Sequence, residues 1–154
     1  MNEMAQPADI DSLPAEAHTL LQRGMALHRS DPAAAEMLFG IARCQAPCSL
    51  PLYRALVKFY NRECRFDAAY DMAALGMREA ARLGQLPPDW RDWTLDLLHG
   101  KEASFALLTL KAMAFLELRR GNTAAAVEIL DQLRQLDPSD GIGSSVVAAL
   151  AAGI

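Results

Sequence analysis

A 34-residue spacing relates two segments of this chain of 154 residues. Ala35 and Ala69 are 34 positions apart, and so are Ala42 and Gly76. A fixed period of this kind indicates one helix–turn–helix unit used again, because a single unit cannot bury its own apolar face and needs a neighbour to cover it. The spacing therefore predicts an all-α stack of helix pairs.

Apolar residues recur at three- and four-residue steps through most of the sequence, which is typical of amphipathic helices. Asp31 and Pro32 predict an N-cap and a first helical residue, and Gly84 predicts a helix end. Helices are expected over residues 13–28, 32–44, 52–63, 66–83, 105–120 and 123–136, with a short capping helix over 146–152. These segments make about three helix pairs and a C-terminal cap.

The third helix pair begins later than the period requires. Ala126 is the counterpart of Ala69, but the two lie 57 residues apart, which is 23 more than one period. In the extra segment a Pro-Pro pair precedes Asp89, which predicts a rigid turn and the cap of a short inserted helix ending near Gly100. We expect a flexible segment over 1–12 and a single domain over 13–152, made of repeat one (15–47), repeat two (50–83), the insertion (84–103), repeat three (104–138) and the cap (143–152).

Composition and charge indicate a folded protein that does not bind nucleic acid. Hydrophobic residues make up 52% of the chain and charged residues 22%, so burial can offset the entropy of ordering. The net charge of -4 lacks the dominant basic field that phosphate binding requires. The N-terminal residues do not resemble a signal peptide, and no stretch approaches the roughly 18 apolar residues of a spanning helix. We therefore expect a cytoplasmic protein without membrane contact.

The residue types that carry chemistry form no recognisable site. Cys44, Cys48 and Cys64 cannot all pair, and no histidine or second cysteine pair lies near the first two to complete a closed metal site. The three histidines have no neighbouring nucleophile and orienting acid, and no phosphate-binding glycine loop is present. We expect a non-catalytic protein with no cofactor and no metal.

Small and aromatic residues stand at positions that resemble those of tetratricopeptide repeat proteins. Ala or Gly is needed where helices approach closely, an aromatic ring fills the wedge between pairs, and proline ends a helix. The matching residues are Gly121, Ala126 and Pro138 in the third unit, and Gly24, Ala35, Phe39, Ala42, Pro47, Tyr53, Tyr60, Phe66, Ala69 and Gly76 in the first two. The resemblance covers about residues 15 to 138 and implies a protein-binding stack of helical hairpins.

A narrower resemblance concerns the runs 53–61, 66–69, 88–93 and 110–115. They look like a family of small tetratricopeptide-type proteins encoded among nitrogen-fixation genes and described as nitrogenase-associated factors. This resemblance implies an accessory factor that binds the molybdenum–iron nitrogenase protein and holds no cluster of its own. Two alternatives stay open, namely a type III secretion chaperone that cradles an exported subunit and a structural subunit of a stacked assembly.

In repeats of this type the first helix of each pair lines a concave groove. The inner face is expected to carry Arg54, Lys58, Asn61 and Arg62 in unit two, Lys111, Phe115 and Arg119 in unit three, and His18, Met25 and His28 in unit one. Such a basic stripe suits a partner with an acidic segment or a C-terminal carboxylate, since Arg and Lys form charge-assisted hydrogen bonds. The alternative interpretation is a solvated helix face.

Trp90 and Trp93, the only tryptophans, both lie in the insertion and would share one helical face with Leu97. They are candidate partner-binding residues, because tryptophan is enriched at binding hot spots. The alternative is that their rings seal the inserted helix against the second and third pairs, because large aromatic side chains dominate burial.

Overall fold

A computed structural model describes residues 13–153 of the chain. The segment 1–12, predicted to be flexible, lies outside the described residues. Within them the fold is all-α, and the predicted series of helix pairs with a short C-terminal helix is confirmed. The helices are α1 (Ala15–Leu27), α2 (Pro32–Gln45), α3 (Leu50–Arg62), α4 (Phe66–Leu83), α5 (Gly100–Arg119), α6 (Thr123–Leu136) and α7 (Ser144–Ala151).

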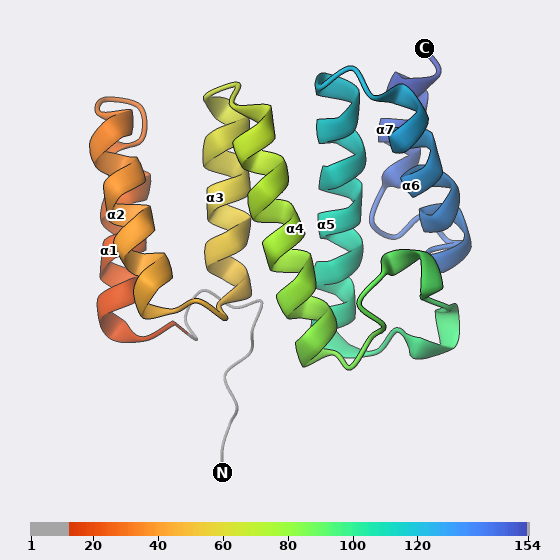
Figure 1. The fold of residues 1–154 in the computed structure, drawn as a ribbon, viewed down its shortest axis with the longest axis horizontal. Helices are drawn as coiled ribbons and strands as arrows, with labels where there is room; N and C mark the ends of the chain where they lie inside the picture. Colours follow the sequence, from red (N-terminus) through yellow and green to blue (C-terminus); the bar gives the residue numbers. More distant parts are fainter. Residues whose placement is uncertain (1–12, 154) are drawn as a thin grey trace.

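Helices that follow one another in the chain lie side by side and run in opposite directions (Figure 1). α1 packs on α2, α3 on α4, α4 on α5 and α5 on α6, while α7 packs against α6 and α5 at the end of the row. The hairpins therefore succeed one another along the long axis of the molecule. None of the helices in the described part of the chain combines the length and apolarity needed to cross a membrane.

Local signals explain where most helices begin and end. The Asp31 carboxylate accepts a hydrogen bond from the Ala34 amide at 3.1 Å, which makes it the N-cap of α2 as predicted. Gly84 follows the last residue of α4, and Gly121 adopts a φ of 84° in the turn before α6. Both α4 and α6 have the predicted bounds.

Two first helices begin earlier than predicted. α3 begins at Leu50, because Pro51 occupies its first turn, where the missing N–H of proline has no helical partner to lose. α5 begins at Gly100, five residues before the expected start, so the third helix pair takes in the end of the predicted insertion. The insertion proper is thus shorter than the sequence indicates.

The inserted helix predicted after Asp89 is not formed. The segment contains two separate 3-10 turns, η2 (Trp90–Asp92) and η3 (Leu95–Leu97), with Trp93 and Thr94 extended between them. The Gln132 amide of α6 donates hydrogen bonds to the carbonyl oxygens of Trp90 and Trp93. The Trp90 carbonyl also accepts from the Trp93 amide, which closes a 3-10 turn instead of an α-helical one, and Gln132 holds the segment in this form against α6.

The buried side chains form two clusters that meet at α3. One face of α3, including Leu52, Leu56 and Phe59, packs with α1 and α2. The C-terminal cluster contains the buried faces of α4, α5 and α6 together with the two tryptophans, and Leu50 and Val57 of α3 join it. Helix α3 therefore lies between two hydrophobic cores and contributes one face to each.

Candidate functional site

A pocket of about 210 Å³ opens where α3, α4 and α5 meet. Its lining is apolar or small except for three cationic side chains, Arg54 and Lys58 from α3 and Lys111 from α5. The uncharged lining residues are Tyr53, Val57, Met72, Ala73, Gly76, Phe105, Leu108, Thr109 and Ala112. Buried residues such as Ala73 and Phe105 form its base, whereas Arg54 and Lys58 are exposed beside its mouth.

Small residues on α4 create the space for this pocket. A Cβ atom added at Gly76 would lie 2.9 Å from the Cβ of Tyr53, so no other residue fits there without a shift. The Tyr53 hydroxyl donates a hydrogen bond to the Pro47 carbonyl at 2.7 Å, which fixes this ring in the wall. The Thr109 hydroxyl donates to the Phe105 carbonyl of its own helix at 2.8 Å. The base of the pocket is therefore preformed and carries no free hydroxyl donor from these two side chains.

The cations at the mouth lack acidic partners. Partial burial, together with the positive charges of Arg54 and Arg62, lowers the pKa of Lys58 below its usual value. Among residues 13–153 no carboxylate forms an ion pair with Arg54 or Lys58. The Lys111 ammonium donates a hydrogen bond to the Ile142 carbonyl at 2.6 Å and so ties α5 to the segment before α7. An anion near Arg54 and Lys58 would relieve their mutual repulsion.

The structure brings some of the predicted groove residues together and separates others. Arg54, Lys58 and Lys111 share the pocket, but the other predicted groove residues do not line it. Arg62 contacts the His28 ring, which lies beyond the end of α1. Outside the pocket are Asn61, Arg62, Phe115, Arg119, His18, Met25 and His28.

Phe115 and Arg119 form a local stack instead of a groove wall. The Arg119 guanidinium lies 4.8 Å from the ring centre of Phe66 on α4 and 5.9 Å from that of Phe115. Sequence reasoning missed the contribution of α4 to the pocket, notably Met72 and Gly76, because it assigned the groove to first helices alone. The signal that could have found them is the 34-residue repeat of a small residue at Ala42 and Gly76, because a small residue at this position indicates a close approach of helices.

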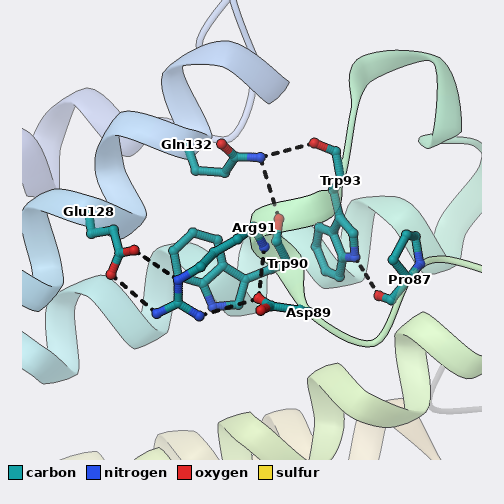
Figure 2. Close-up of polar contacts among 7 residues, drawn as sticks. All are labelled: Pro87, Asp89, Trp90, Arg91, Trp93, Glu128 and Gln132. Atoms are coloured by element: carbon teal, nitrogen blue, oxygen red, sulfur yellow. Dashed lines mark hydrogen bonds and ion pairs between the residues drawn. The ribbon is translucent and has the colours of Figure 1, made fainter.

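Both tryptophan rings are buried in the C-terminal cluster, as the packing interpretation expects, although the inserted helix they were to seal is not formed. Trp90 is 7% exposed and Trp93 is 2% exposed. The Trp93 indole donates a hydrogen bond to the Pro87 carbonyl at 2.7 Å, while Gln132 of α6 binds the backbone carbonyls of both tryptophans (Figure 2). The predicted common helical face with Leu97 is wrong, because Trp90 lies in η2, Trp93 is extended after it and Leu97 lies in η3.

Arg91, which the sequence did not single out, fastens the insertion to α6. Its guanidinium forms an ion pair with Glu128 at 2.8 Å and a second with Asp89 at 3.3 Å, and it lies over the Trp90 ring at 4.5 Å (Figure 2). The hydrogen bond to Glu128 raises the pKa of Arg91 and lowers that of Glu128. The insertion is therefore fastened to α6 by the Arg91–Glu128 ion pair and the Gln132 hydrogen bonds.

A polar clamp joins the first helix pair to the second. It consists of Glu36 on α2, Tyr60 on α3 and Arg65 in the following turn. The Tyr60 hydroxyl donates to Glu36 at 2.7 Å, and Arg65 forms an ion pair with Glu36 at 2.8 Å. Burial and the hydrogen bond to Glu36 raise the pKa of Tyr60 to about 12, while the bonds from Arg65 and Tyr60 lower that of Glu36.

In two wider hollows the charged and polar side chains named below are already paired with each other or with a neighbour. The one beside α1 and α2 contains Glu16 and Gln45, which hydrogen bond to each other at 3.2 Å. The one beside Cys64 contains Arg65 and Arg120, and both guanidinium groups are already in ion pairs. The pocket at α3, α4 and α5 is thus the place where unpaired charge and a preformed apolar surface coincide.

The three cysteines are exposed and unpaired. Across the described residues, His, Cys, Asp and Glu side chains do not gather in groups of three or more that could hold a metal ion. No family model matches the chain, and no curated protein or solved structure matches it at a significant level. The residues of the pocket therefore carry the functional argument.

Proposed function

We propose that this protein is a non-catalytic interaction module that binds an acidic segment of a protein partner in the pocket between α3, α4 and α5. The observation that supports this proposal is the combination of an apolar base with the unpaired cations Arg54 and Lys58. A segment with one apolar side chain among carboxylates would bury the first and place the second beside these cations.

The magnitudes favour modest affinity for a single segment. Burying one large apolar side chain contributes about 1.5–3 kcal/mol, and hydrogen bonds to charged groups contribute about as much. Ordering an extended segment opposes binding by about 0.5–1.5 kcal/mol for each immobilised side chain. We therefore expect stable docking to need additional contacts of a folded partner around the pocket.

The test is binding to synthetic peptides that combine several Asp or Glu residues with one Leu, Phe or Met. The wild-type protein is expected to bind these peptides and to lose binding when the carboxylates become amides or the apolar residue becomes Ser. The double variant Arg54→Glu/Lys58→Glu should bind at least about tenfold more weakly, which corresponds to a loss of about 1.4 kcal/mol or more.

Arg23→Glu/Arg29→Glu is the matched control, because it reverses two exposed charges at α1, outside the pocket. This control should bind like the wild type. Equal binding by the Arg54→Glu/Lys58→Glu variant and the wild type would show that the pocket is not the site.

The partner is proposed from resemblance. The resemblance to tetratricopeptide repeat proteins supports a peptide-binding stack, and the narrower resemblance suggests the molybdenum–iron nitrogenase protein as the cytoplasmic partner. Capture from cells grown with and without fixed nitrogen tests this identity. Recovery of nitrogenase subunits only from fixing cells supports it, whereas recovery of a secretion needle or translocator protein would favour the chaperone alternative.

A further inference from the structure

One exposed apolar side chain of this chain stands between free carboxylates. Leu95 in η3 is 55% exposed, and Asp92 and Asp96 on either side of it are exposed as well. Neither carboxylate forms an ion pair within residues 13–153, and Asp96 accepts a hydrogen bond from the Thr94 hydroxyl at 2.6 Å.

The other exposed large apolar side chains differ from Leu95 in this respect. Near Val127, for example, Glu128 is paired with Arg91, and near Leu83 the carboxylate of Glu79 is paired with Arg82. In the described part of the chain, the remaining members of the set are Met25, Met37, Ile41, Val146 and Leu150. Leu95 is thus distinguished by two unpaired carboxylates within four positions of it.

We propose that Leu95 of one copy of this protein enters the pocket of a second copy and brings Asp92 and Asp96 beside Arg54 and Lys58. This inference rests on the proposed function, since the insertion has the chemistry of the ligand assigned there: one apolar side chain among carboxylates. The pairing is complementary in charge. Within the described residues, Arg54 and Lys58 at the mouth of the pocket form no ion pair with an acidic residue, and Asp92 and Asp96, which flank Leu95 at what we call the tip of the insertion, form none with a basic residue.

The occupant is a second copy and not the insertion of the same chain. Residues of the insertion contribute nothing to the lining of the pocket. The insertion is bonded to α6 through the Arg91–Glu128 ion pair and the Gln132 hydrogen bonds, and its tryptophans are buried. These contacts hold Leu95 in place without using its side chain, so the tip is preorganised for an external contact.

The contact joins two different surfaces, which makes it heterologous. Each copy offers one tip and one pocket, and such an arrangement continues head to tail unless a rotation closes it. Because one side chain and its neighbours make a small interface, the association is weak and depends on protein concentration. Self-association also occupies the pocket, so a partner with an acidic segment would compete with it and shorten the head-to-tail assemblies.

Sedimentation velocity over a concentration series of the full chain tests the proposal. The wild-type protein is expected to show a rising average mass, and the rise should disappear in about 1 M salt, where the screening length is about 3 Å. Both Leu95→Ser and Arg54→Glu/Lys58→Glu should stay monomeric at all concentrations. Leu150→Ser removes a similarly exposed leucine, 52% exposed, that lacks flanking carboxylates, and it should associate like the wild type.

A mixture of the two broken variants gives the sharper result. The Leu95→Ser copy keeps its pocket, and the Arg54→Glu/Lys58→Glu copy keeps its tip, so together they should form a one-to-one dimer that grows no further. A wild-type protein that stays monomeric, a Leu95→Ser variant that associates like the wild type, or a mixture that stays monomeric would overturn the proposal. Binding of acidic peptides to Leu95→Ser distinguishes failure of this proposal from failure of the proposed function. If the peptides bind this variant as they bind the wild type, the proposed function stands even where self-association is absent.

Discussion

The junction between α2 and α3 differs from the junction between α4 and α5. At the second, α4 and α5 pack closely for much of their length, with the buried Ala73 of α4 and Phe105 of α5 at the base of the pocket. At the first, the Phe39 and Phe59 rings, 5.2 Å apart, stand between helices whose backbones approach at few points. One stack therefore contains a tight junction that shapes the pocket and a junction that depends on two rings and a polar clamp.

This difference predicts unequal stability along the stack. In a linear array each unit is stabilised by its own packing and by its neighbour, so the unit with the weaker junction opens first. Here that unit is the hairpin α1–α2, whose buried cluster is completed by one face of α3 and by the partly buried Met72 of α4. The pocket lies on the other side of α3 and should persist when the first hairpin opens.

The largest expected effect is that of Phe39→Ala. Phe39 is 2% exposed and contacts Phe59 across the first junction, so its loss should lower the free energy of unfolding by about 3–5 kcal/mol. Hydrogen exchange should accelerate in α1 and α2 while α4, α5 and α6 keep most of their protection. Phe105→Ala, at the tight junction, is the matched control and should affect the C-terminal helices instead. Uniform loss of protection in Phe39→Ala would contradict the difference between the junctions.

Gly76→Ala tests the close approach of α4 to α3 in the wall of the pocket. The added Cβ would lie 2.9 Å from the Tyr53 Cβ, and overpacking of this kind destabilises by about 1–3 kcal/mol, more than the roughly 0.5–1 kcal/mol that Ala gains in a helix. We expect a lower midpoint in urea and weaker binding of acidic peptides.

Gly40→Ala provides the comparison, because nothing lies within 4 Å of a Cβ at that helical position. This variant should be more stable than the wild type by about 0.5–1 kcal/mol. If Gly76→Ala and Gly40→Ala changed the free energy of unfolding in the same direction, close helix approach would not be what shapes the pocket.

The smallest effect concerns the clamp and depends on pH. The pKa of Glu36 is lowered in the folded state, so its contribution is present above the unfolded pKa of about 4.5 and is lost as the pH falls through the folded value. The pKa of Tyr60 is raised to about 12, so its contribution is present below the unfolded value of 10.0 and is lost as the pH rises toward 12.

The protection of the α2 amides, taken relative to the intrinsic exchange rate at each pH, should therefore be highest between these limits. Tyr60→Phe should remove the alkaline part of this dependence. Tyr70→Phe, a substitution of a tyrosine that packs on the C-terminal cluster, should retain it. An unchanged alkaline response in Tyr60→Phe would mean that the clamp does not hold the first hairpin.

The regular helices could be predicted from the sequence because their signals are local. The bounds of α4 and α6 follow from apolar spacing and from glycine at the turns. The insertion could not be predicted in this way, since Asp89 caps a 3-10 turn as readily as an α-helix. Gln132 and Glu128, about 40 positions away on α6, hold the observed form by binding its backbone and Arg91, and spacing within the segment does not reveal these contacts.

The candidate site was predictable only in part for a similar reason. Counting positions on the first helices identified Arg54, Lys58 and Lys111, which the fold brings to one pocket. The same counting included Phe115 and Arg119, which stack locally, because a helical face alone does not show where α4 leaves space. That binding takes place at the pocket stays a prediction.

Backbone amide NMR of the full chain, titrated with an acidic peptide that contains one leucine, tests the central claim most directly. The account predicts shifts that centre on Lys58, Gly76 and Thr109 around the pocket, and no change at Glu36 or Phe39 of the first junction. Shifts centred on the first hairpin, or spread along every exposed basic residue, would contradict it.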